Sequence, residues 1–150
     1  MNPIERDLAR EELTIASYQK RIKAYLLDES LIGLVVLAAL WERLGALSDN
    51  PLALIETVNS YVVWIALFHI IYHTIFVALY GATLGKMWQR IIVIEIGGFG
   101  KPSFVTALIR ALTRVVSDLC MALGFLWAFA DPLRQTWHDK FSRVIVIDAP

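Results

Sequence analysis

One apolar run, residues 61–80 (YVVWIALFHIIYHTIFVALY), constrains the fold more than any other feature because it contains no formal charge. A helix needs roughly 20 apolar residues to cross a hydrocarbon core about 30 Å thick, and this run has that length. Tyr61, Trp64 and Tyr80 lie near its ends, and such aromatic side chains favour the membrane surface. The run therefore predicts a transmembrane helix.

A second apolar run, residues 24–41, carries Asp28 and Glu29 near its start, and only residues 30–41 are free of charge. We therefore expect a second transmembrane helix with acidic side chains in the membrane or at its rim. The 23 residues before this run are mostly polar and exceed the basic segment of a normal signal peptide. Both spans are expected to stay in the mature protein.

A third apolar stretch, residues 115–130, is short for a crossing and contains Asp118. Arg110 and Arg114 precede it, and the four-residue spacing puts all three charged side chains on one helix face. We favour a third helix that dips into the membrane and returns, or lies along the cytoplasmic surface, over a full crossing. Its polar face would then point toward protein or water.

Two short β-branched runs, residues 90–96 (RIIVIEI) and 143–148 (RVIVID), could pair as strands outside the hydrocarbon core. Basic side chains are frequent before the predicted span at residues 24–41 and scarce in residues 42–60. The positive-inside rule then predicts a cytoplasmic N-terminus. Further basic side chains in the C-terminal segment favour the cytoplasm for the strand pair as well.

Composition supports an all-α membrane protein with two transmembrane helices, a third embedded or interfacial helix and these two short strands. The mean hydropathy is +0.58, and 57% of the residues are hydrophobic. Fourteen basic side chains balance fourteen acidic ones, which argues against nucleic-acid binding, and the single cysteine, Cys120, excludes a disulfide framework. Residues 1–150 predict one domain, with a polar N-terminal segment (1–15) and a core (16–147).

Charged side chains near the apolar runs are the first candidates for function. Arg21 and Asp28 lie on one helix face about two turns, or roughly 10 Å, apart, which is too far for a direct ion pair. Each therefore needs another partner. The candidates are Arg110, Arg114, Asp118 and Asp139. Because a buried carboxylate is costly unless paired, Asp28 is either part of a structural ion pair or protonates in a cycle.

His69 and His73 lie one turn apart in the middle of the central span, a spacing that can chelate a metal or pass a proton. Two ligands do not make a metal site, and His138 is the only other histidine. We therefore predict no metal centre and no cofactor. The pair is either a proton relay or two neutral side chains that form hydrogen bonds with neighbouring helices.

The segment GATLGK, residues 81–86, ends the central span, and its glycines permit a tight turn. Its lysine can meet lipid phosphates or a carboxylate, but no Ser or Thr follows it as in a P-loop. The functional positions of this turn are expected to be Gly81, Thr83, Gly85 and Lys86.

A last polar group, Gln135, His138 and Asp139, follows the third apolar stretch. It has an amide, an imidazole and a carboxylate, but no serine or cysteine nucleophile in a recognisable turn accompanies it. We therefore predict no catalytic residues and do not expect an enzyme.

Taken together and in this order, the motifs resemble the RDD family of small bacterial membrane proteins, named for one arginine and two aspartates. The resemblance covers about residues 16–147. Arg21 and Asp28 match the arginine and the first aspartate, and Asp139 is preferred as the second aspartate over Asp118. The pattern consists of Ala16, Arg21-x-x-Ala24-x-x-x-Asp28, the turn 81–86, Arg110-x-x-x-Arg114-x-x-x-Asp118 and Gln135-x-x-His138-Asp139.

The resemblance implies a multi-pass protein of the bacterial cytoplasmic membrane, and a transport role, because sodium/proton antiport is reported for some members. We therefore expect a transporter, or a transporter component, that moves cations or protons. Asp28 would be the cation site, Arg21 its charge competitor, and the two central histidines a proton relay. Two or three helices cannot enclose a polar path, so we expect a homo-oligomer or a partner membrane protein, surrounded by lipid.

The alternative is a membrane subunit or assembly factor that transports nothing. Its Arg/Asp network would fix helix packing, and its basic loops would hold anionic lipid. The chain departs from the family pattern at Val77, where many members have an acidic residue, and at Arg143-Val144, where they have Gly-Thr. His69 and His73 match no motif of the family.

Overall fold

A computed structural model describes residues 3–47, 49–119 and 127–149 as a mostly helical chain with one small sheet. The helices and strands are α1 (Pro3–Arg10), α2 (Tyr18–Gly45), α3 (Pro51–Ser60), α4 (Val62–Tyr80), α5 (Leu84–Trp88), β1 (Ile91–Glu95), α6 (Phe104–Leu119), the 3-10 turn η1 (Trp127–Phe129), α8 (Trp137–Phe141) and β2 (Val144–Asp148).

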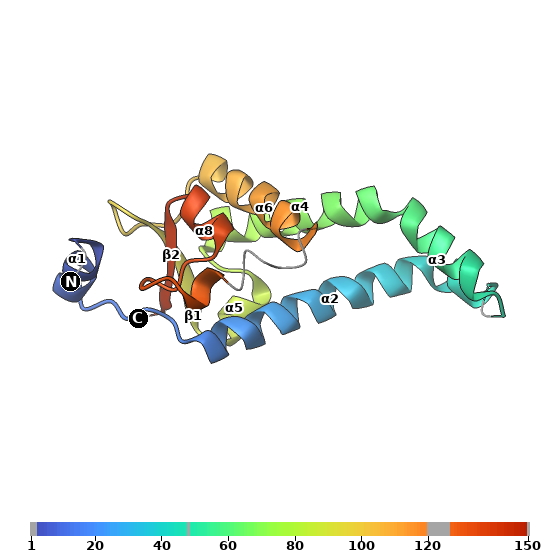
Figure 1. The fold of residues 1–150 in the computed structure, drawn as a ribbon, viewed down its shortest axis with the longest axis horizontal. Coiled ribbons are helices and arrows are strands. Elements are labelled where there is room, and N and C mark those ends of the chain that lie inside the picture. Colours follow the sequence, from blue (N-terminus) through green and yellow to red (C-terminus); the bar gives the residue numbers. More distant parts are fainter. Residues whose placement is uncertain (1–2, 48, 120–126, 150) are drawn as a thin grey trace.

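The long helices α2 and α4 extend from one end of the molecule, the base, to α3 at the other end (Figure 1). The base contains both strands with α5, α6 and α8, and the N- and C-termini lie there too. Both α2 and α4 are long and apolar enough to cross a membrane. The predicted span at residues 61–80 corresponds to α4.

Helix α2 is longer than the predicted run of residues 24–41, because it begins at Tyr18 and ends at Gly45. Its first turn is capped by Ser17, whose hydroxyl accepts a hydrogen bond from the Lys20 N–H. Hydropathy detects only the apolar middle of such a helix, whereas polar residues continue it at both ends. Arg21 therefore lies in the same helix as Asp28.

The exposed faces of α2 and α4 are apolar. Leu34 in α2 is 70% exposed and Val63 in α4 is 72% exposed, and other large apolar side chains surround them. A continuous apolar surface of this kind requires lipid or a protein partner to cover it. It agrees with the two predicted spans.

The strands β1 and β2 pair antiparallel, with Val93 opposite Val146, which confirms the predicted pairing of the two β-branched runs. Both faces of the sheet are covered. One face packs on helices through a cluster that includes Ala24, Val77 and Ala107, and the other packs on the N-terminal segment through Leu8. The sheet thus ties both ends of the chain to the long helices, which positions the polar side chains described below.

Helix α6 begins at Phe104, and its described part ends at Leu119. Its arginines, Arg110 and Arg114, are buried, while Phe104 and Val116 are exposed, so the polar face points toward protein as predicted. Residues 120–126 of the predicted third helix, with Cys120, lie outside the described residues, and Trp127–Phe129 near its predicted end form the 3-10 turn η1. The expected dip into the membrane therefore stays a prediction.

Candidate functional site

The carboxylate of Asp28 lies at the junction of α2, α4 and α5 and is fully buried. Its Oδ1 accepts hydrogen bonds from the Tyr72 hydroxyl at 2.7 Å and from the Gly85 N–H at 2.8 Å. Its Oδ2 accepts one from the Thr83 hydroxyl at 2.6 Å. Neutral donors from two other segments therefore surround this aspartate, and two of them belong to the turn 81–86.

The two glycines of this turn meet different structural requirements. Gly81 ends α4 in the left-handed conformation, with φ +70°, which glycine adopts without steric cost. Gly85 allows α5 to touch α2, because a Cβ there would lie only 2.2 Å from the Ala24 carbonyl oxygen. The motif thus brings a backbone N–H directly to Asp28, as well as making the predicted tight turn.

Lys86 is the nearest cation to Asp28 within the described residues. Its Nζ lies 4.0 Å from Asp28 Oδ2 and donates a long hydrogen bond of 3.4 Å to the Thr83 hydroxyl. Burial, together with the nearby Arg110 and Arg114, lowers the pKa of Lys86 to about 7, and Asp28 opposes this shift. The sequence analysis expected a carboxylate or a lipid phosphate for this lysine, and the carboxylate is Asp28.

We expect the free energy of unfolding to rise with pH between about 7 and 10.5 because of Lys86. The unfolded chain keeps this proton up to the ordinary pKa of 10.5, whereas the folded chain releases it near pH 7. The unfolded state therefore binds more protons in this interval. Denaturant titrations in detergent across this range should show the rise in the wild type and in Lys20→Met, but not in Lys86→Met. An equal slope in all three proteins would contradict the assignment.

The Tyr72 hydroxyl has two partners, since it donates to Asp28 and accepts a hydrogen bond of 3.1 Å from the Leu84 N–H. Tyr72→Phe is expected to lower the free energy of unfolding by about 1–3 kcal/mol, because it removes the partner of two buried groups. The control is Tyr80→Phe, on a side chain that is 58% exposed, and it should stay within about 0.5 kcal/mol of the wild type. Equal effects of both substitutions would show that the hydroxyl carries no such role.

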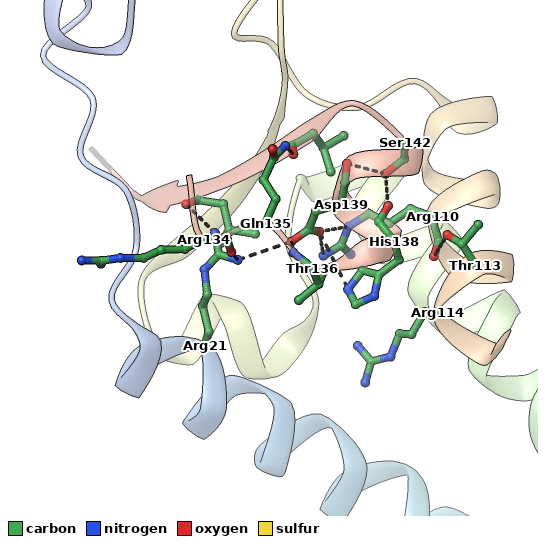
Figure 2. A network of polar contacts seen from close by, with 12 residues as sticks. Arg21, Arg110, Thr113, Arg114, Arg134, Gln135, Thr136, His138, Asp139 and Ser142 are labelled. Carbon is green, nitrogen blue, oxygen red and sulfur yellow. Dashed lines mark hydrogen bonds and ion pairs between the residues drawn. The ribbon is translucent and has the colours of Figure 1, made fainter. Parts of the chain in front are cut away.

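A second buried carboxylate, Asp139 in α8, is bound by two arginines (Figure 2). Arg110 donates from Nε at 2.9 Å and from Nη2 at 2.8 Å to Oδ1, and Arg21 Nη1 lies 3.3 Å from Oδ2. The Thr136 N–H also donates to Oδ2, as part of a capping box at the start of α8. The family arginine and the preferred second aspartate therefore contact each other.

The carboxyl group of Asp139 is ionised. Burial alone would raise the pKa of its carboxyl, but Arg110 and Arg21 hold it well below its usual range. The pKa of His138 is lowered by burial, despite the opposing effect of Asp139. At neutral pH the aspartate is thus a permanent counter-ion to the arginines, and the neighbouring imidazole is neutral.

The same cluster joins α2 to the C-terminal segment. Arg21 also donates to the carbonyl oxygens of Arg134 at 2.6 Å and Val146 at 3.1 Å. Gln135 donates from its amide to the Val144 carbonyl at 2.7 Å. These contacts fix the chain around α8, so the predicted residues Arg21 and Gln135 have clear positioning roles.

A third polar group surrounds Glu29. Arg114 Nη2 lies 2.7 Å from its Oε1, and His69 Nε2 lies 3.2 Å from its Oε2. Asp118 Oδ2 lies 3.8 Å from Arg114 Nε, so Asp118 belongs to this group and not to the Arg21 cluster. His69 Nδ1 faces the Ile65 carbonyl at 3.0 Å. Since a carbonyl only accepts, Nδ1 carries a proton, and the contact of Nε2 with Glu29 must hold another proton.

His73 does not extend the contact between His69 and Glu29 into a longer chain of hydrogen bonds among the described residues. Its ring centroid lies 6.4 Å from that of His69, and its buried ring nitrogens have no hydrogen-bond partner within the described part of the chain. The two histidines lie near each other on α4, as their spacing predicted, but no hydrogen bond between described residues links them into a relay.

The predicted residues therefore divide among three neighbouring groups, centred on Asp28, Asp139 and Glu29. Of the four partners proposed for Arg21 and Asp28, Asp139 pairs with Arg21, whereas none of the four binds Asp28. The sequence analysis assigned no role to Tyr72 or Glu29. A hydroxyl and a carboxylate inside apolar runs are the signals that could have identified them.

The profile of the RDD family matches residues 15–143. No curated protein and no solved structure matches the chain. The matched segment contains the three polar groups described above.

Proposed function

Because this chain belongs to the RDD family, whose members are membrane proteins, we propose that it exchanges monovalent cations for protons across the bacterial cytoplasmic membrane. Two apolar helices of spanning length support the membrane location. In this proposal α2 and α4 cross the bilayer, and the N-terminus lies in the cytoplasm with the base. The cation binds at Asp28, within the membrane or at its rim.

The observation that carries the proposal is the surrounding of Asp28. Small hard cations prefer oxygen ligands, and the Asp28 carboxylate lies within hydrogen-bond distance of the Thr83 and Tyr72 hydroxyls. Lys86 Nζ is 4.0 Å away, so its charge neutralises the carboxylate without a direct hydrogen bond. A bound cation can neutralise the Asp28 carboxylate in place of the ammonium group. Lys86, and not Arg21, is then the charge that competes for Asp28.

The proton path and the assembly complete the proposal. His69 and Glu29 share a proton, so this pair is one proton-binding site on the proposed path, and it lies in the apolar part of the molecule. Two spanning helices cannot enclose a polar path by themselves. We therefore propose that a second copy of the chain, or a partner membrane protein, closes the path on the side of α2 and α4 that is covered by exposed apolar side chains.

Flux in proteoliposomes tests this function. The purified protein is reconstituted with a pH gradient, and sodium, lithium, potassium or calcium is added. We expect at least one monovalent cation to collapse the gradient, and Asp28→Asn of verified folding to abolish the effect. The matched control is Asp148→Asn, which removes a partly exposed carboxylate far from Asp28 in the sequence and should retain flux. Equal flux through Asp28→Asn, or no response to any ion by the wild type, contradicts the proposal.

A specific observation favours a second function, that of a membrane subunit or assembly factor. Asp139 is bound by Arg110 and Arg21 in a buried network, and such a network needs no turnover to explain it. Under this alternative, Asp28→Asn would lower stability without any flux to lose. The absence of ion-dependent flux in folded wild-type protein would support it, and the search would turn to a partner.

A further inference from the structure

A cavity of about 210 Å³ lies between α2, α6 and the segment around α8, beside the two arginines of the Asp139 cluster. Four cationic side chains line it, and Asp139 is the only carboxylate that lines it among the described residues. The four cations, all buried or nearly so, are Arg21, Lys86, Arg110 and Arg114. Asp28 does not line the cavity, so this site differs from the proposed cation site, although Lys86 belongs to both.

The carboxylates around the cavity are already engaged. Both oxygens of Asp139 accept hydrogen bonds from Arg110 and Arg21. Glu29 binds Arg114 from the other side, and its side chain is 31% exposed. Because buried cations need nearby negative charge, a cavity with this lining favours an anion over a cation or a neutral molecule.

We propose that this cavity binds a phosphate group, carried by an organic ester. Guanidinium groups match phosphate oxygens with paired hydrogen bonds, and here they come from α2 and from α6. The remaining wall contains the apolar side chains Ile22 and Phe129, which suit the organic part of such an ester. The phosphate belongs either to a lipid head group or to a soluble molecule.

The position of the cavity favours the lipid source. It lies where the long helices α2 and α4 meet the base, which is the level of a bilayer surface if these helices cross the membrane. Arg114 extends from α6 toward α2, below His138, in Figure 2. A head group entering between α2 and α6 would meet this guanidinium, which already has Glu29 as a partner.

Two substitutions distinguish ligand binding from a structural role, because both break the Arg114–Glu29 ion pair. Arg114→Gln removes a phosphate donor and should weaken binding by about tenfold or more. Glu29→Gln removes a competing carboxylate and should strengthen binding a few-fold. If the pair served structure alone, both variants would change binding in the same direction. Lys20→Gln, at a partly exposed lysine outside the cavity, is the control for unspecific charge effects.

Binding is measured by calorimetry on the full chain in a neutral detergent, with four probes. Short-chain phosphatidylglycerol and phosphatidylcholine represent lipids, and glycerol phosphate and inorganic phosphate represent soluble anions. Preferred binding of phosphatidylglycerol identifies a lipid site, and binding of the soluble phosphates identifies a metabolite site. Either result, with opposite effects of Arg114→Gln and Glu29→Gln, supports the proposal. No binding of any probe by folded wild type, or binding that Arg114→Gln leaves unchanged, overturns it.

Discussion

Asp139→Asn is expected to lower the free energy of unfolding by about 3–5 kcal/mol, because it leaves two buried guanidinium groups without their counter-ion. The substitution keeps the size of the side chain and removes only its charge. Arg110 and Arg21 both lose the carboxylate that lies within 3.3 Å of each. Denaturant titration of the purified protein in detergent measures the loss.

The control for Asp139→Asn is Asp148→Asn, which breaks an ion pair of 2.6 Å with Lys20. Those side chains are 31% and 42% exposed, so solvent screens the pair and the expected loss is below about 1 kcal/mol. The lowered pKa of Asp139 gives a second check. The stability that the Asp139 carboxylate contributes is fully present above the ordinary aspartate pKa. It is lost as the pH falls toward the pKa of this group in the folded protein. A similar loss in both variants would contradict the account of the cluster.

Gly85→Ala is expected to be comparably disruptive, with a loss of at least about 3 kcal/mol, at the upper end of overpacking effects. The added Cβ would lie 2.2 Å from the Ala24 carbonyl oxygen and 2.9 Å from Asp28 Cγ. Because the first of these atoms is backbone, α5 must move away from α2, and the N–H that binds Asp28 moves with it. Unfolding in detergent and the yield of folded protein both report the effect.

Gly33→Ala is the matched control, since nothing lies within 4 Å of a Cβ built at this position of α2. Alanine favours helix over glycine by up to about 1 kcal/mol, so this variant should be neutral or slightly more stable. If Gly85→Ala behaved like Gly33→Ala, the close contact between α5 and α2 would be wrong.

The long elements of the fold could be predicted because their signals are local. Composition and length predict α4 from its uncharged apolar run. β-Branched composition predicts β1 and β2 in the same way. The short helices α3, α5 and α8 were not predicted, since helices of this length depend on packing and capping more than on periodicity.

Pairing between distant side chains was harder to predict. Arg21 and Asp139 are 118 positions apart, and the sequence left Asp118 as an alternative partner of Arg21. The fold brings α8 to α2 and so pairs Arg21 with Asp139. Asp28 meets the turn 81–86 only because Gly85 lacks a side chain. That requirement is invisible until the two segments are known to touch. Motif order selected the candidate residues, whereas tertiary packing decided which of them meet.

Direct cation binding tests the central claim, that a cation takes the place of the Lys86 ammonium beside Asp28. Isotopically labelled monovalent cations, sodium first and then lithium and potassium, are equilibrated with the purified wild type, Asp28→Asn and Asp148→Asn in detergent, after each protein is verified as folded. The account predicts saturable binding to the wild type and to Asp148→Asn, and its loss in Asp28→Asn. Binding that Asp28→Asn retains in full, or no saturable binding to the wild type, would contradict it.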